Sequence, residues 1–279
     1  MGVKDETLLK ARSLLQWLWE SKTGRAAESL GLKAELKRVY DAVDTEATAV
    51  ISFDVAGETI DLELETVAER DGFDDYQGAE KPLMASVVDT IGPDDVFYDV
   101  GAYIGTYSAL VATAEPEATV HAFEPGPHRR TRLRRTQFLN DTEFTIHDVA
   151  LSNKSTNAYL TSGGRITNDP ATDISQEHKQ RQGQKHQHER DPITVAHGDT
   201  YVRNQGLELP TVMKIDVEGG ELQVLEGLTK TLPNCRDLFI EVHPQDVANV
   251  EALFEFLSIH GFTANRLFDR ENVFFIHAQ

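Results

Sequence analysis

Acidic and imidazole side chains recur at the points where two apolar runs of the sequence end. Asp216 and Glu218 lie in the segment MKIDVEGGE, and Glu241 and His243 lie in the segment IEVHP. Carboxylates and imidazoles can transfer protons or bind a cation. Because the carboxyl ends of parallel strands meet at one edge of a sheet, we expect these four side chains to lie together at a ligand-binding edge.

Lys214 precedes Asp216 by two residues in the same apolar run. On a strand over residues 211–217, Lys214, Asp216 and Glu218 would project to one side. Burying three ionisable groups is costly unless they pair, so the sequence predicts an ion pair of Lys214 with Asp216 or Glu218. Two alternatives stay open: a salt-bridged strand end without catalytic role, or a site for a hard cation such as Mg²⁺ at Asp216, Glu218 and Glu241.

A glycine-containing turn follows the apolar run 96–100. The segment VFYDVGAYIG has the pattern D-x-G-x-x-x-G, and a helix-compatible stretch begins at residue 106. The two glycines let the backbone approach a ligand closely and adopt dihedral angles that a Cβ atom would penalise. A buried strand, a turn and a helix N-terminus in this order form a nucleotide-type cofactor site. Its candidate cofactor-binding residues are Asp99, Gly101, Ala102, Tyr103 and Gly105.

The charge of Asp99 and the glycine spacing indicate which cofactor this turn would bind. Dinucleotide-binding turns carry the pattern G-x-G-x-x-G, which is not the pattern here. A carboxylate at the end of the strand suits a cationic ligand better, and S-adenosylmethionine (SAM) carries both an ammonium and a sulfonium group. A dinucleotide-binding oxidoreductase and a turn that serves packing alone are the alternatives.

Two further acids follow predicted strands. Glu124 lies 23 residues after Gly101, and an acid near this offset commonly binds the hydroxyl groups of a ribose. Asp148, near the end of the next predicted strand, could accept a hydrogen bond from an adenine amino group. The alternative roles are a helix cap for Glu124 and a turn-forming acid for Asp148.

From about residue 76, predicted strands alternate with predicted helices, which is typical of a doubly wound, mostly parallel α/β sheet. The last two strand-like runs, 262–268 and 272–277, are close enough in sequence for an antiparallel hairpin. We therefore expect a Rossmann-like sheet that ends in an antiparallel hairpin, an ending typical of SAM-dependent methyltransferases. The other predicted strands are 96–100, 119–123, 143–149, 211–217 and 237–242, and the predicted helices are 106–114, 127–139, 220–228 and 247–260.

Residues 1–75 are predicted to form a small N-terminal extension, and residues 76–279 the main domain. A helix over 5–40 and a hairpin of strands 49–55 and 59–64 would form a cap or a homo-oligomerisation element.

Residues 161–191 are polar and are predicted to form a mobile insertion, either a lid or a disordered decoration. Its residues His178, His186 and His188 are interpreted as solvated side chains rather than as metal ligands.

The chain has 279 residues, with 46 acidic residues against 27 Lys and Arg, so its formal net charge is −19. This charge disfavours nucleic acid as a partner. It suits the cytoplasm of a salt-accumulating microbe, because the screening length is about 3 Å at 1 M salt.

The single cysteine, Cys235, fits a reducing cytoplasm, and no run approaches the ~18 apolar residues of a membrane helix. One basic cluster, interpreted as a solvated helix face, comprises Arg129, Arg130, Arg132, Arg134 and Arg135.

The order of five sequence blocks resembles the FkbM-type SAM-dependent methyltransferases. These blocks are FYDVGAYIGTYS, HAFEPGPH, VALSNKS, MKIDVEGGELQVLEG and IEVHP, within residues 80–279. The resemblance implies a class I methyltransferase fold, SAM as methyl donor, and a hydroxyl acceptor on a sugar or a natural product. Tyr103 departs from the family, in which an asparagine is common at this position.

The resulting hypothesis is O-methylation of a hydroxyl group of a sugar, a glycan or a small metabolite by in-line transfer. The turn would hold the methionine part of SAM and Glu124 its ribose. Asp216 or His243 would act as the base that a poor nucleophile requires, and Glu241 would orient His243 or contact the acceptor. A catalytically silent Rossmann-like binding protein and a nucleic-acid methyltransferase are the remaining alternatives.

Overall fold

The computed structural model describes residues 49–65, 67–161, 164–168, 191–244, 247–270 and 273–279. The chain divides into two compact units, one of residues 1–51, 63–78 and 173–186, the other of residues 52–62, 79–172 and 187–279. All candidate site residues lie in the second, larger unit.

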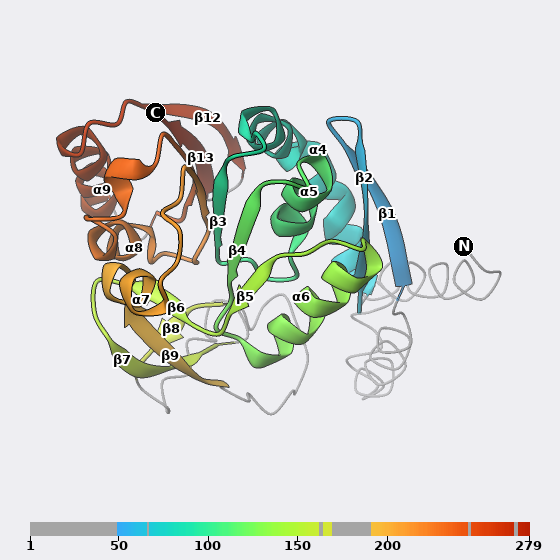
Figure 1. Ribbon diagram of the computed structural model, residues 1–279, viewed down its shortest axis with the longest axis horizontal. Coiled ribbons are helices and arrows are strands. Elements are labelled where there is room, and N and C mark those ends of the chain that lie inside the picture. The colour runs from blue at the N-terminus through green and yellow to red at the C-terminus, as the bar shows by residue number, and fades with distance from the viewer. Residues whose placement is uncertain (1–48, 66, 162–163, 169–190, 245–246, 271–272) are drawn as a thin grey trace, which may run out of the picture. The chain divides into compact units, whose positions relative to one another are not determined.

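A seven-stranded sheet in the order β12-β13-β11-β10-β3-β4-β5 forms the centre of the larger unit (Figure 1). Neighbours from β11 to β5 are parallel, and β13 pairs antiparallel with both β11 and β12. The predicted fold, a mostly parallel sheet that ends in an antiparallel hairpin, is confirmed. The strands are β3 (Val96–Val100), β4 (Thr119–Phe123), β5 (Thr145–His147), β10 (Val212–Ile215), β11 (Asp237–Val242), β12 (Ala264–Arg270) and β13 (Val273–Ala278).

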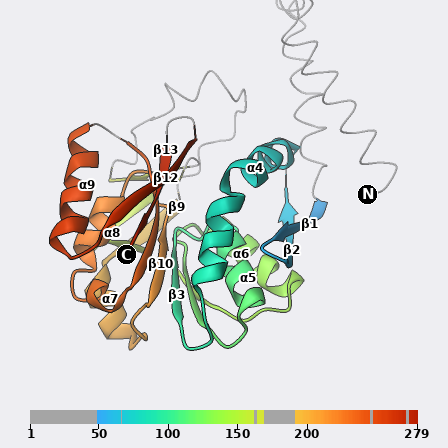
Figure 2. The ribbon, with the colours of Figure 1, turned by 90° about the horizontal axis from the view of Figure 1, so that it is seen from above.

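Helices cover both faces of this sheet, as Figure 2 shows. The part of α4 (Val67–Thr90) from Ala79 onward lies on the same face as α5 and α6, and α7, α8 and α9 cover the other. Strands β3, β10 and β11 are buried along their whole length, which explains their near-continuous apolar sequences. The remaining helices are α5 (Thr106–Ala114), α6 (Pro127–Leu139), α7 (Gly198–Gln205), α8 (Glu221–Gly227) and α9 (Val247–Ile259), with a short 3₁₀ turn at Leu232–Asn234.

The centre of the sheet is a topological switch point. The chain leaves β3 to form β4 on one side, and β10 pairs with β3 on the other side. Open α/β sheets bind their ligands in the crevice at the carboxyl ends of such strands. The glycine turn follows β3 directly, and the acidic segment follows β10, so both candidate sites lie at this crevice.

A second, four-stranded sheet, which the sequence did not predict, has the order β6-β9-β7-β8. Its strands are too short and too mixed in composition to give a clear period-2 pattern. Residues 166–167 belong to this sheet, although they fall within the insertion predicted over residues 161–191. Residues 169–190 of that insertion, with its three histidines, lie outside the described residues. The strands are β6 (Ala150–Ser152), β7 (Thr156–Leu160), β8 (Ile166–Thr167) and β9 (Asp191–His197).

The predicted hairpin near the N-terminus is present as β1 (Ala49–Val55) and β2 (Glu58–Leu64). The predicted helix over 5–40 lies outside the described residues. Helix α4 continues through residue 75, and the proposed division of the chain at that residue stays a prediction. Among the described residues, no helix is both long and apolar enough to cross a membrane.

Candidate active site

The turn after β3 requires its two glycines. Gly101 has φ +86°, and a Cβ atom there would lie 1.8 Å from the carbonyl oxygen of Asp216. Gly105 has φ +89°, and its Cβ would lie 2.2 Å from Leu133 Cδ1. The first glycine therefore brings the turn against the backbone of the segment that follows β10, and the second allows α6 to pack against α5.

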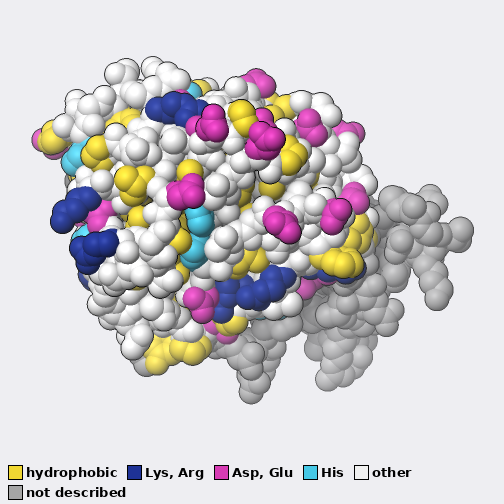
Figure 3. Space-filling view, viewed as in Figure 1, with side chains coloured by type: hydrophobic (Ala, Val, Ile, Leu, Met, Phe, Trp, Pro, Cys, Tyr) yellow, Lys and Arg dark blue, Asp and Glu magenta, His cyan; other side chains and the backbone are white. Residues whose placement is uncertain are grey.

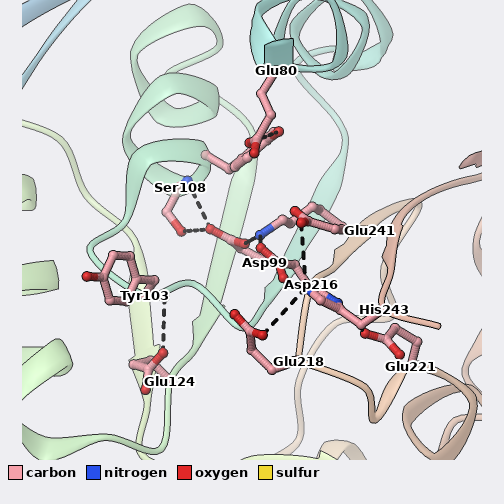
Figure 4. Close-up of polar contacts among 12 residues, drawn as sticks. Glu80, Asp99, Tyr103, Ser108, Glu124, Asp216, Glu218, Glu221, Glu241 and His243 are labelled. Atoms are coloured by element: carbon pink, nitrogen blue, oxygen red, sulfur yellow. Dashed lines mark hydrogen bonds and ion pairs between the residues drawn. The ribbon is translucent and has the colours of Figure 1, made fainter. Parts of the chain in front are cut away.

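Asp99 is completely buried and holds the start of α5 in place (Figure 4). Its Oδ2 accepts hydrogen bonds from the backbone N–H of Ser108 at 3.1 Å and from the Ser108 hydroxyl at 2.6 Å. Its Oδ1 lies 3.7 Å from Nζ of Lys214. Burial raises the pKa of Asp99, against the charge of Lys214 and the hydrogen bonds of Ser108. The side chain thus contacts the protein, and a direct contact with a cofactor stays a prediction.

Glu124 links the glycine turn to the N-terminus of α6. Its Oε2 accepts a hydrogen bond from the backbone N–H of Tyr103 at 3.1 Å (Figure 4). Its Oε1 accepts one from the backbone N–H of Gly126 at 2.7 Å. Burial raises the pKa of Glu124. Tyr103 has φ +52°, a conformation that asparagine adopts more readily than tyrosine. Asp148 follows β5 and is exposed at the same edge of the sheet.

Lys214 pairs with Asp216, as the sequence predicted, with Nζ 3.1 Å from Oδ2. The prediction that Lys214, Asp216 and Glu218 alternate on one strand is wrong, because β10 ends at residue 215. Asp216 and Glu218 lie in the following loop, where Glu218 has φ +57°. Such a conformation is costly for a residue with a Cβ atom and tends to occur at functional sites.

His243 follows β11 and is held by Glu221, the first residue of α8. Its Nδ1 lies 2.8 Å from Oε1 of Glu221. Its Nε2 lies 3.6 Å from both Glu218 Oε2 and Glu241 Oε1. Burial alone would lower the pKa of His243, but the hydrogen bond to Glu221 and the charges of Asp216, Glu221 and Glu218 raise it to about 9. The imidazole of the free protein is therefore cationic at neutral pH.

Glu241 is buried and contacts Arg270 of β12. Arg270 Nη2 lies 2.9 Å from Glu241 Oε1, and Nη1 of the same guanidinium contacts Glu80 of α4. Burial, followed by the charges of Asp216 and Glu80, raises the pKa of Glu241 to about 8. One ligand atom each of Asp216, Glu241 and His243 lies within 4.8 Å of the others, so the predicted catalytic residues converge.

The cluster carries more acids than bases. Carboxylates this close together disfavour ionisation of one another, and a cationic ligand would favour their charged form. The carboxylates are Glu80, Asp99, Asp216, Glu218, Glu221 and Glu241, and the cations are Lys214, Arg270 and His243.

Sequence reasoning missed three residues of this cluster. Glu221 could have been noticed, because it lies in the same acidic segment as Asp216. Glu80 and Arg270 gave no signal, since a single charged residue in a helix or at a strand end is ordinary.

A model of the methyltransferase FkbM domain family matches residues 99–264. The chain belongs to the FkbM methyltransferase family. The matched segment contains the glycine turn, Glu124, Asp216, Glu241 and His243. The protein is therefore a methyltransferase, and the oxidoreductase alternative no longer applies.

Three curated relatives support this assignment. The hexuronic acid methyltransferase AglP of Haloferax volcanii is 29% identical over 203 residues, which cover 71% of this chain and 77% of the relative. The 31-O-demethyl-FK506 methyltransferase FkbM of Streptomyces tacrolimicus is 29% identical over 198 residues, covering 61% and 74%. The 2-O-methyltransferase NoeI of Sinorhizobium fredii is 25% identical over 169 residues, covering 56% and 66%.

The basic cluster of this FkbM-family methyltransferase lies on α6. Figure 3 shows Lys and Arg side chains gathered over this helix. Arg129 and Arg132 lie over the ring of Tyr103, with guanidinium carbons 5.0 and 5.8 Å from the ring centroid. Part of the cluster therefore packs on the glycine turn, and the predicted solvated helix face describes only Arg134 and Arg135.

Proposed function

We propose that this protein transfers a methyl group from SAM to a hydroxyl oxygen of a sugar, a glycan or a small metabolite. The observation that carries the proposal is the pair His243–Glu221, which places an oriented imidazole beside the glycine turn at the switch point of the sheet. The names of the relatives support it, since they describe a hexuronic acid methyltransferase, a 31-O-demethyl-FK506 methyltransferase and a 2-O-methyltransferase.

The residues at the switch point fit SAM. In the turn from Asp99 to Gly105, Gly101 and Gly105 have positive φ angles and carry no side chain, which permits close approach of a cofactor at these two positions. Glu124 and Asp148 would bind the ribose and the adenine. The surplus of carboxylates around Asp216 suits a ligand with a sulfonium and an ammonium group. SAM, when bound, supplies the electrophilic methyl group.

We assign the base to His243 rather than to Asp216. Nζ of Lys214 lies 3.1 Å from Oδ2 of Asp216, so this carboxylate oxygen is already engaged by an ammonium group of the protein. Glu221 accepts a hydrogen bond from Nδ1 of His243, so that the deprotonated imidazole presents Nε2 as the acceptor atom. Asp216 and Glu241 would then position the hydroxyl group of the acceptor. Holding two reactants in attack geometry contributes much of the rate in such a transfer.

A divalent cation is the second use of the same groups. Asp216, Glu241 and His243 offer ligand atoms within 4.8 Å of one another, so His243 replaces Glu218 in the ligand set that the sequence suggested. A bound cation would acidify the acceptor hydroxyl. The ammonium group of Lys214, 3.1 Å from Asp216, opposes a cation at this position. Turnover that survives dialysis against EDTA would remove the metal role, and turnover restored only by Mg²⁺ or Mn²⁺ would establish it.

The proposal is tested with methyl-labelled SAM and a panel of hydroxyl acceptors that begins with hexuronic-acid-containing glycans. We expect label in an O-methyl group, and we expect His243→Asn to abolish transfer while SAM still binds in calorimetry. His260→Asn is the matched control, because His260 is exposed directly after α9 and its ring contacts the backbone of Phe256. Transfer to nitrogen or carbon, or full activity of His243→Asn, would contradict the proposal.

We further propose that the protein works in a reducing, salt-rich cytoplasm. The support is the net charge of −19 and the single, buried Cys235. Homo-oligomerisation through the N-terminal region stays a prediction, because residues 1–48 lie outside the described residues.

A further inference from the structure

The side chain of Arg270 contacts two acids that are far apart in the sequence, Glu80 and Glu241. It lies at the end of β12, after the family-matched segment, and Glu80 of α4 lies before that segment. The guanidinium contacts Glu80 Oε1 on one side and Glu241 Oε1, at 2.9 Å, on the other. Strand β12, helix α4 and strand β11 thus meet at one side chain. Figure 4 shows the two acids, Glu80 and Glu241, together with His243.

Glu80 is a buried carboxylate whose contacts fix its position. It is 1% exposed, and its Oε2 accepts a hydrogen bond of 3.4 Å from the Tyr107 hydroxyl. Burial raises the pKa of Glu80, and the charge and hydrogen bond of Arg270 oppose this shift. Tyr107 is itself held by Lys214, whose Nζ lies 4.8 Å from the centroid of the Tyr107 ring. We call Glu80 and Arg270 together the brace. Its Glu80 end is anchored to α5 through Tyr107 and, through Lys214, to β10.

We propose that Glu80 and Arg270 are positioning residues for methyl transfer, which hold the Glu241 carboxylate away from the imidazole of His243. The proposal rests on the proposed function and concerns the same site. Neither residue would touch the reacting atoms, and both would act through Glu241.

The distances explain why Glu241 needs such a brace. Glu241 Oε1 lies 3.6 Å from His243 Nε2, just outside hydrogen-bonding distance. The same oxygen lies 2.9 Å from Arg270. Without the guanidinium, the carboxylate would move onto Nε2 and occupy the atom that must accept the proton of the acceptor. The brace keeps Nε2 accessible by giving Oε1 another partner.

Glu80 has the corresponding role for Arg270. The Arg270 side chain is 27% exposed, so water competes for the guanidinium and the long side chain has freedom to lose. A buried carboxylate on its far side fixes its direction. Buried ion pairs add little net stability compared with apolar residues, so a geometric role accounts better for Glu80 in this place than a stabilising one.

The test uses Glu80→Gln, Arg270→Gln and Arg270→Lys in the full-length protein. We expect Glu80→Gln and Arg270→Gln to lower kcat about 10- to 100-fold, the loss that a misplacement of about 1 Å causes. The KM for SAM and its calorimetric affinity should change less than about twofold, because the brace does not touch the cofactor turn. Arg270→Lys should recover part of kcat. Arg266→Gln on the same strand is the matched control, since Arg266 contacts the exposed Asp269 and the ring of Phe274 rather than Glu80 or Glu241.

A crystal structure of Arg270→Gln separates the failure of this inference from the failure of the proposed function. We expect Glu241 Oε1 to move from 3.6 Å to hydrogen-bonding distance of His243 Nε2. An unchanged distance overturns the brace, whether or not an acceptor has been found. Wild-type kcat in folded Glu80→Gln also overturns it, as does an activity loss that merely follows the fraction of unfolded protein.

Discussion

Nδ1 of His243 lies 2.8 Å from Oε1 of Glu221, although the two residues belong to different elements. The same carboxylate oxygen accepts a hydrogen bond of 2.9 Å from the backbone N–H of Gly219. Glu221 therefore fixes both the ring of His243 and the loop that carries Asp216 and Glu218. One buried carboxylate couples the orientation of the proposed base to the position of the acidic loop.

Glu221→Gln should lower the pKa of His243. The anion at 2.8 Å raises this pKa towards 9, and losing an adjacent opposite charge costs about 1 unit or more. Because only the deprotonated imidazole accepts a proton, kcat/KM of the wild type should rise with pH up to about 9. In the variant, the maximal kcat/KM should be lower, and the rise of kcat/KM on the acid side of the pH profile should occur at lower pH. Glu226→Gln, an exposed change on the same helix, should leave the pH profile unaltered; an unshifted limb in Glu221→Gln would remove the pair from the mechanism.

Glu124→Gln should weaken SAM binding about tenfold, which is about 1.4 kcal/mol. The amide has only one acceptor oxygen, and Glu124 already accepts hydrogen bonds from Tyr103 and Gly126. Calorimetry with SAM and with its demethylated product measures the loss. Glu143→Gln at an exposed position is the control. Equal SAM affinities of Glu124→Gln and the wild type would show that Glu124 only holds the glycine turn in place and does not contact SAM.

A buried histidine pair makes the fold sensitive to acid. His121 Nδ1 lies 3.0 Å from His147 Nε2, and burial, followed by the charge of His121, lowers the pKa of His147 to about 4. Between pH 6.5 and about 4 the unfolded chain binds a proton at His147 that the folded chain does not. The free energy of unfolding should therefore decrease as the pH is lowered through this window. The decrease should be roughly 3 kcal/mol, at about 1.4 kcal/mol per pKa unit.

His147→Gln tests this origin of the pH dependence. Glutamine can still hydrogen bond to His121 but does not titrate, so urea unfolding of the variant should depend less on pH between 6.5 and 4. Identical pH dependence of the variant and the wild type would assign the acid sensitivity to carboxylates such as Asp95, which Arg236 holds ionised.

The sequence was most informative where a strand is buried on both faces. Runs such as VFYDV and DLFIEV leave little alternative to parallel strands, and the acids at their ends had to meet at one edge. It could not place Arg270 beside Glu80, since a contact between residues 190 positions apart leaves no periodic pattern. The sheet of β6 to β9 escaped notice because strands of two to seven residues with mixed polarity resemble loops.

Gly101→Ala should destabilise the protein by at least about 2 kcal/mol, the range of overpacking in a rigid site. The new methyl group would lie 1.8 Å from the carbonyl oxygen of Asp216, and φ is +86°. Gly206→Ala is the matched control, because φ is +64° there but no atom lies within 4 Å of the added Cβ. The control should show only the conformational cost of about 1 kcal/mol. Equal destabilisation of both variants in urea unfolding would show that the turn can move away from Asp216.

Chloride salts should stabilise the protein well beyond physiological concentrations. With a net charge of −19, repulsion acts over the screening length, which falls from about 10 Å at 0.1 M to about 3 Å at 1 M salt. We expect the Tm to rise by several degrees between 0.1 and 2 M KCl, a range chosen around these values. In the variant Glu251→Lys/Glu255→Lys on exposed positions of α9, each exchange adds two positive units, so the net charge goes from −19 to −15. This variant should gain less Tm from the same salt, because less repulsion is left to screen. A Tm that is independent of KCl, or an equal gain in both proteins, would mean that the acidic surface is not an adaptation to salt.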